Sequence, residues 1–311
     1  MFRIIVGLTV MSIWIDTVGG AVVTPFSPSP FIPDRSATAD EIGSRAVQTR
    51  DTRYAVWPIA TTTGIPYRMD PTYSATERSV ITQALGAISS DLNQCIKFVP
   101  YNRVANANQD HIYLGKTFNN GTIPLTCFSF PGRLVAQQGS GQKLALFSGV
   151  DGCLGSVKDA MGYIVHVLGL RDEIKRPDRD ASVQVFPQNV KPALLSANVL
   201  QPYTSGQVDL ASTAFDFNSI TIPPPEKFAF PGVVLYTARV SGRTVGGSLP
   251  RLSLGDCQAI SALYAPTCKA ALCVDPYSGT DATSATSATS ATVPSTTSRG
   301  PLEPIFPGFT R

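Results

Sequence analysis

Residues 162–180 read GYIVHVLGLRDEIKRPDRD and combine a helical pattern, a glycine at its end and a charged tail. This stretch completes a helical pattern whose apolar residues share one face: Val157, Met161, Ile164, Val165 and Leu168. Gly169 follows directly, and a glycine at this point predicts a left-handed C-terminal cap. The RPDRD charges, among them Arg176 and Asp178, are expected to form a knot of ion pairs and hydrogen bonds that fastens two lobes.

The bulk composition is that of a folded protein. Of its 311 residues 43% are hydrophobic and 15% charged, which is enough for one core of ordinary size. The net charge of +3, without a block of like charge, argues against nucleic-acid partners. Residues 1–20 combine Arg3, a short apolar run and small residues, which predicts a signal peptide and secretion, with a signal anchor as the alternative. No later stretch is apolar enough to span a membrane.

The six cysteines agree with export, because an even number without a C-x-x-C pair is typical of a disulfide set. Asn120 begins a glycosylation sequon. Residues 21–45 are rich in Pro, Ser and Thr and are expected to be extended. Residues 274–311 contain repeated Ala-Thr-Ser and predict a disordered tail, either an O-glycosylated stalk or a plain tail. One globular domain is expected over residues 46–273.

Element order within this domain predicts an α+β fold. A helix is expected in residues 74–95, capped by Ser74 or Thr76, and a last helix around residues 253–264. Residues 96–101, 110–115 and 143–148 read as strands. Strands followed by a helix, and then by an irregular half that ends in a helix, suit two lobes with a cleft between them. The N-terminal lobe is a twisted sheet with two helices, and the C-terminal lobe is irregular.

From about residue 45 to 268 the chain resembles the astacin family of secreted zinc endopeptidases. The segments that carry the resemblance, in order, are RYAVWPIATTTGIPYRMD, CIKFVPY, CFSFPGR, RPDRD and SLGDCQAISALYAPTC, the first being similar to the family's opening strand. The resemblance implies a two-lobed, metzincin-like fold with Zn²⁺ as the family's cofactor. It also implies disulfides that join Cys127 to Cys153 and Cys95 to Cys268, which leaves Cys257 and Cys273 to pair with each other.

The resemblance further implies an activation step. FIPD places Asp34 where the family's prosegment carries its zinc-blocking aspartate. Cleavage after Arg45 would leave Ala46 as a new terminus, and the family buries this ammonium group against the glutamate that Glu173 matches. A buried ammonium requires such a partner. An exposed loop charge is the alternative for Glu173.

The zinc-binding residues of the family are mostly missing. Aligned on its signature H-E-x-x-H-x-x-G-x-x-H, His166 matches the second histidine and Gly169 the glycine. Gly162 stands at the first histidine, Tyr163 at the catalytic glutamate and Asp172 at the third histidine.

Counting histidines gives the same result. The chain contains two, His111 and His166, so no register supplies three, and His111 is expected to be structural or exposed. His166 with a possible Asp172 makes a poor site, because catalytic zinc normally has three protein ligands. Downstream, Thr221 and Pro223 replace the methionine and tyrosine that the family has near its metal.

Hydrolysis is therefore not expected. Tyr163 cannot act as the general base, because an ordinary tyrosine is protonated at neutral pH. We predict no catalytic residue, no firm metal ligand and no cofactor. The sequence favours a secreted astacin-like homologue whose cleft binds extended peptide or an extracellular protein. The alternatives are a zinc metalloendopeptidase with a remodelled site and a structural secreted glycoprotein.

Overall fold

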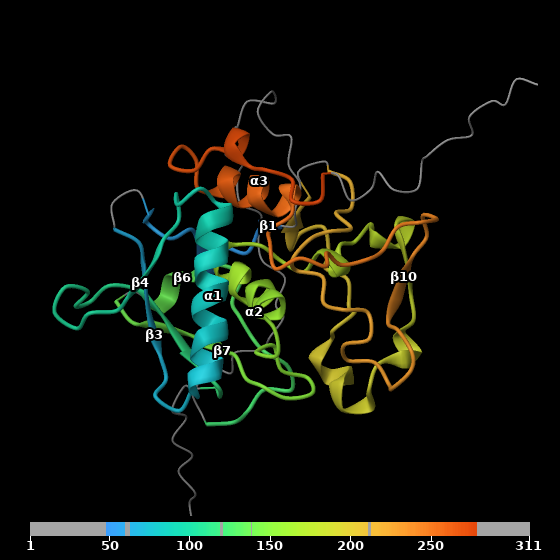
Figure 1. Ribbon diagram of the computed structural model, residues 1–311, viewed down its shortest axis with the longest axis horizontal. Coiled ribbons are helices and arrows are strands. Elements are labelled where there is room, and N and C mark those ends of the chain that lie inside the picture. Colours follow the sequence, from blue (N-terminus) through green and yellow to red (C-terminus); the bar gives the residue numbers. More distant parts are fainter. Residues whose placement is uncertain (1–47, 60–62, 119–120, 138, 211–212, 279–311) are drawn as a thin grey trace, which may run out of the picture. The chain divides into compact units, whose positions relative to one another are not determined.

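The computed structural model describes residues 48–59, 63–118, 121–137, 139–210 and 213–278 (Figure 1). The predicted signal peptide, Asp34, Ala46, Asn120 and the Ser/Thr-rich tail lie outside the described residues or almost entirely so. The boundaries at residues 20, 45 and 273 therefore stay predictions. Among the described residues, no helix combines the length and apolar character needed to cross a bilayer.

A four-stranded parallel sheet forms the centre of the first lobe. Its strands, in spatial order, are β4 (Phe98–Pro100), β3 (Ile65–Met69), β5 (His111–Gly115) and β7 (Gly141–Ala145). Ile112, Leu114 and Leu144 alternate along their strands and are buried, so this face lies against the core. Beyond β7, residues around Phe128 add an antiparallel edge through the single bridge Phe128–Ala145.

Two of the expected strands differ in extent. The opening segment is divided into β2 (Tyr54–Ala55), which pairs with β6 (Arg133–Leu134), and β3. The chain leaves the first strand because Trp57 turns inward, where its Nε1 donates to the Val167 carbonyl at 2.9 Å. β7 begins two residues before the expected strand, because its pairing with β5 starts at Gly141 opposite His111.

Two helices cover the sheet. α1 (Ala75–Asp91) starts at Ser74, whose hydroxyl accepts from the Glu77 N–H while the Glu77 carboxylate accepts from Ser74 N–H. α2 (Val157–Ile164) is capped by Ser156 and continues as a 3₁₀ turn, η3 (Val165–Leu168). The two helices contact each other over the sheet (Figure 1).

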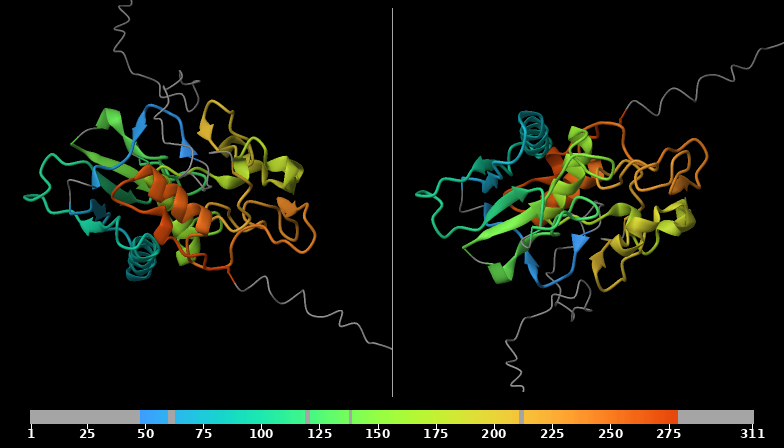
Figure 2. Two further views of the ribbon diagram at one scale, coloured as in Figure 1. Left: turned by 90° about the horizontal axis from the view of Figure 1, so that it is seen from above. Right: turned by 90° about the horizontal axis from the view of Figure 1, so that it is seen from below.

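The second lobe, residues 173–250, is built from short elements. They are η4 (Glu173–Lys175), η5 (Arg179–Ala181), β8 (Val183–Val185), η6 (Pro187–Asn189), η7 (Pro192–Ala197), β9 (Val208–Asp209) and β10 (Tyr236–Ala238). β8 pairs with β10, and β9 pairs with β1 (Gln48–Thr49). Ile174, Val183, Ile222 and Tyr236 belong to a separate core cluster beneath them. In both views of Figure 2 this lobe, yellow to orange, lies beside the sheet.

The last helix returns to the first lobe. α3 (Leu254–Leu263) follows the second lobe in sequence, yet Cys257, Ala259 and Ile260 belong to the core of the sheet lobe. The Cys95–Cys268 disulfide fastens this end of the chain to the segment after α1. The other disulfides join Cys127 to Cys153 and Cys257 to Cys273, and two short 3₁₀ turns, η2 (Val135–Gln137) and η8 (Ala270–Leu272), complete the fold. All three pairings are those expected from the sequence.

Candidate functional site

The predicted site lies at the end of α2 and in the turn that follows it. Gly169 has φ +111°, a left-handed conformation that ends the helix and reverses the chain, as its sequence context predicts. This reversal brings Asp172 back to His166, so that the Asp172 Oδ1 lies 3.3 Å from the imidazole Nε2. The turn therefore assembles the two residues that the sequence offers as possible ligands.

His166 is held between two oxygen atoms. Its Nδ1 lies 2.9 Å from the Leu170 carbonyl oxygen, and its Nε2 faces the Asp172 carboxylate. Asp172 is itself bound by the Tyr203 hydroxyl, which donates at 2.7 Å, and by the Lys175 ammonium at 3.0 Å. Although burial opposes ionisation, Lys175 and His166 hold the pKa of Asp172 well below its ordinary value.

Gly162 has no space for a side chain. A Cβ atom built on it would lie 2.8 Å from the Ile220 carbonyl oxygen, a backbone atom that belongs to the turn opposite α2. The space that a histidine would need at this position is therefore filled by the segment that contains Thr221.

Tyr163, at the general-base position of the resemblance, is half-buried and packs against the core of the first lobe. Burial raises the pKa of its hydroxyl above the ordinary value, and a hydrogen bond with Thr126 opposes this shift only in part. Its ring lies edge-on to the His166 ring, with centroids 6.2 Å apart. A hydroxyl in this state holds its proton at neutral pH and cannot take one from water.

Glu173 is fully buried rather than exposed, so the exposed-loop alternative is wrong. Its Oε1 accepts from the Asp216 N–H at 2.8 Å and lies 3.3 Å from the Arg176 guanidinium. Among the described residues, its Oε2 has no hydrogen-bond partner. Burial raises the pKa of Glu173 to about 8, because Arg176 offsets the loss of hydration only in part.

Two further carboxyl groups lie next to this one. Asp256 accepts from the Ile220 N–H and from the Ser219 hydroxyl, both at 2.7 Å, and Asp216 accepts from the Ser253 hydroxyl at 2.6 Å. Burial, together with the charge of Asp216, raises the pKa of Asp256 to about 7. The turn from Ser219 to Thr221 is thus fastened to α3 by an acid that is easily protonated.

The expected knot around Arg176 is present, but it acts within the second lobe. Arg176 is fully buried and binds the Asp178 carboxylate with two hydrogen bonds of 2.8 Å. It also donates to the Thr213 carbonyl at 2.5 Å. These hydrogen bonds fasten residues 173–178 to the loop at 213–214. Both segments belong to the second lobe, so the expectation that the knot joins the two lobes is wrong.

The side chains present do not fit the three-histidine zinc site of the family. Gly162 offers no ligand atom and no space for one. His111 lies in β5, where its ring stacks on Tyr101 with centroids 4.1 Å apart, so it does not join His166. Within the described parts of the chain, no three His, Cys, Asp or Glu side chains are grouped so that they could hold a metal ion.

Several residues of the site were not found from the sequence. Tyr203 reaches Asp172, and the Lys227 ammonium lies 3.1 Å from the Asp159 carboxylate and 5.9 Å from the Tyr163 ring centre. Tyr203 and Lys227 come from the loop-rich second lobe, where no periodicity indicates which side chains point inward. Asp256 lies in the segment SLGDC, which the sequence assigns to the start of the last helix. Its position three residues after Ser253 is that of a capping box, and this pattern could have indicated that Asp256 is held at the helix start.

Comparison with known proteins identifies the relatives of this chain. The sequence profile of the astacin peptidase family matches residues 49–265. Zinc metalloproteinase nas-4 of Caenorhabditis elegans is 26% identical over 76% of this chain and 66% of its own length. Bone morphogenetic protein 1 of Xenopus laevis is 28% identical over 83% of this chain and 34% of its own length. The chain thus spans less than two thirds of the length of these relatives.

A solved structure gives the same result for the fold. High choriolytic enzyme 1, a hatching enzyme zinc-protease from Oryzias latipes, superimposes with a TM-score of 0.52 at 24% identity. The match covers 68% of this chain and 94% of that structure. The predicted α+β fold of astacin type is confirmed.

Proposed function

Since the chain belongs to the astacin family, we propose that it is a secreted astacin homologue that does not hydrolyse peptides but binds them in its cleft. Three disulfides support an oxidising, extracellular location. One observation carries the proposal: the Gly162 position is closed by the Ile220 carbonyl, so the first zinc ligand is absent and its space is filled.

The loss of hydrolysis is supported at two further positions. Tyr163 replaces the residue that would accept a proton from water, and its raised pKa keeps the hydroxyl protonated. The His166 Nε2, which a metal would need, faces the Asp172 carboxylate, and Lys175 and Tyr203 bind the same carboxylate. The relative nas-4 is named a zinc metalloproteinase, whereas this chain has Gly162, Tyr163 and Asp172 at the positions of two zinc histidines and the catalytic glutamate of the family's signature.

Peptide binding is supported by the edge of the sheet. Phe128 pairs with Ala145 through both its N–H and its carbonyl, at 2.8 and 2.9 Å. By strand alternation, Cys127 and Ser129 turn their backbone groups to the opposite side. Within the described chain, no backbone–backbone hydrogen bond uses the N–H of Cys127 or Ser129. An extended peptide can add to such an edge as a further strand.

Removal of the prosegment belongs to the proposal as well. After cleavage at Arg45, the Ala46 ammonium would be available to the buried Glu173, whose Oε2 has no partner among the described residues. A charged partner would offset the cost of ionising this carboxyl group. N-terminal sequencing of the secreted protein is expected to give Ala46.

Zinc content and peptidase activity test the loss of hydrolysis. The purified chain is expected to contain no stoichiometric zinc, to keep its thermal stability in phenanthroline, and to leave a fluorogenic peptide library uncut. The medaka hatching enzyme is the positive control, because its name records a zinc-protease. One tightly held zinc per chain, or cleavage that phenanthroline abolishes and Zn²⁺ restores, would establish a remodelled peptidase instead.

Binding is tested with a matched pair of edge variants. A display library of random extended peptides supplies ligands, and Ser129→Pro is expected to abolish their binding because it removes the N–H that a new strand would use. Ser129→Ala keeps that N–H and is expected to bind as the wild type does. Binding that survives Ser129→Pro argues against strand addition, and a library without binders favours a structural glycoprotein.

A further inference from the structure

Among the described residues, two ion pairs join the first lobe, at the loop after β7 and at α2, to the second lobe. Asp151, in the loop after β7, lies 2.7 Å from the Lys191 ammonium at the start of η7. Asp159, in the first turn of α2, lies 3.1 Å from the Lys227 ammonium. In both pairs the carboxylate belongs to the first lobe and the ammonium to the second. We call them the interlobe pairs.

The interlobe pairs are better shielded from water than ordinary surface ion pairs. The Lys227 side chain is 8% exposed and the Asp159 side chain 20%. Lys191 and Asp151 are 24% and 23% exposed. Surface pairs contribute little because water and salt screen them, whereas partly buried charges are screened much less. Separating these pairs therefore costs more free energy than separating exposed ion pairs of the same length.

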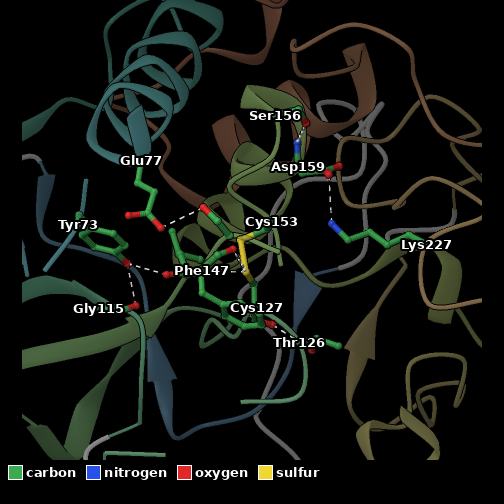
Figure 3. Close-up of a disulfide and its surroundings, with 12 residues drawn as sticks. Tyr73, Glu77, Gly115, Thr126, Cys127, Phe147, Cys153, Ser156, Asp159 and Lys227 are labelled. Carbon is green, nitrogen blue, oxygen red and sulfur yellow. Dashed lines mark hydrogen bonds and ion pairs between the residues drawn. A yellow bond between two sulfur atoms is a disulfide. The ribbon is translucent and has the colours of Figure 1, made fainter. Parts of the chain in front are cut away.

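Lys227 also lies close to two aromatic rings, one in each lobe. Its ammonium lies 5.9 Å from the Tyr163 ring centre and 5.7 Å from that of Phe228, within the range of cation–π attraction. Tyr163 in turn hydrogen-bonds with Thr126, next to the edge residue Cys127. Figure 3 shows Lys227 extended toward Asp159, to the right of the Cys127–Cys153 disulfide. A continuous chain of contacts thus joins the sheet edge to the second lobe.

We propose that the interlobe pairs hold the cleft closed in the free protein and open together, so that a peptide reaches the sheet edge only after both have separated. This inference rests on the proposed peptide-binding function, since it describes how access to the same edge is controlled. Because the closed form is then the major state, the apparent affinity for a peptide is reduced by the fraction of molecules that are open.

Chemical labelling of lysine amines, read by mass spectrometry, tests whether the pairs open together. In Asp151→Asn, which removes the partner of Lys191, labelling of Lys227 is expected to rise about fivefold, because one of two pairs that close the cleft is lost. Asp159→Asn is expected to raise labelling of Lys191 in the same way. Both substitutions preserve size, and neither changes the immediate partner of the lysine that is read.

Lys116 is the internal control. It pairs with Glu77 at 2.8 Å within the first lobe, and its labelling is expected to stay constant in both variants.

Unchanged labelling of Lys227 in Asp151→Asn would overturn the closure. The labelling needs no ligand, so it can succeed or fail independently of peptide binding. Coupled labelling without any peptide binder would leave the closure intact and refute the binding function alone.

Discussion

At the scale of single residues, Gly162 and Glu173 are two that local sequence does not explain: a glycine inside a helix and a fully buried carboxyl group. Gly162 lies inside α2, where alanine would ordinarily be the better residue, yet the Ile220 carbonyl fills the space a Cβ would need. Glu173 is buried, and the cation that pairs with it among the described residues, Arg176, also binds Asp178. Contacts with other parts of the fold, rather than secondary-structure propensity, therefore determine which residue fits at each of these positions.

Gly162→Ala is expected to destabilise the protein by about 1–3 kcal/mol, because the new Cβ overpacks against a backbone oxygen that cannot move alone. Gly86→Ala in α1 is the control, since a Cβ there meets nothing within 4 Å. That substitution is expected to stabilise the protein by about 0.5–1 kcal/mol through helix propensity. Urea unfolding measures both, and opposite signs are the expected outcome. Stabilisation by both substitutions would contradict the close contact.

The raised pKa values of Glu173 and Asp256, about 8 and about 7, predict how stability depends on pH. An unfolded carboxyl group loses its proton near pH 4, whereas the folded one keeps it to higher pH. The folded state therefore binds more protons in this window, and stability falls as the pH rises from about 4.5 to 8.

Between the pKa of the unfolded chain and that of the folded protein, each of these groups is deprotonated in the unfolded state and protonated in the folded state. In that window each lowers the free energy of unfolding by about 1.4 kcal/mol per pH unit. Urea unfolding at several pH values is expected to show this decline in the chain that retains its prosegment. Glu173→Gln, which cannot ionise, is expected to reduce the slope. An unchanged slope would mean that Glu173 is ionised in the folded protein.

At the scale of elements, the first lobe was predictable because its elements follow regular periods. α1 and α2 have apolar residues at helical spacing and capping serines, and the strands β5 and β7 bury alternate side chains. The second lobe has strands of two or three residues joined by 3₁₀ turns, which are too short for any period to appear. Contacts such as Tyr203–Asp172 and Lys227–Asp159 depend on how these loops return, and no local pattern encodes that.

The cap of α1 tests one choice that the sequence left open. The structure places Ser74, not Thr76, at the N-cap, with Glu77 completing a capping box. Ser74→Ala is expected to lower the free energy of unfolding by about 1 kcal/mol, because the Glu77 N–H loses its acceptor. Thr76→Ala lies on the exposed face of the same turn and is expected to change it by less than about 0.5 kcal/mol. Equal effects would refute the assigned cap.

At the scale of the whole molecule, the Cys95–Cys268 disulfide holds the two ends of the first lobe together. The path of the chain leaves the sheet lobe, builds the second lobe and returns through α3 to the same core. Cys95 and Cys268, 173 residues apart, close this path, whereas Cys257 and Cys273 are only 16 residues apart. The larger loop excludes more conformations from the unfolded ensemble.

Replacing Cys95 and Cys268 by alanine is expected to cost about 5 kcal/mol, against about 3 kcal/mol for Cys257 and Cys273, by the loop-entropy relation. Thermal unfolding under oxidising conditions ranks the two double variants. The reverse ranking would indicate that native-state contacts around α3, rather than the length of the closed loop, determine the contribution of each disulfide.

The same cross-link has a practical consequence for anyone who follows degradation of this protein. A single backbone cut between positions 95 and 268 would leave both fragments tethered through sulfur. On a non-reducing gel the nicked species would migrate near the intact mass, and two bands would separate only after dithiothreitol. Apparent resistance to a protease has to be judged on reduced samples.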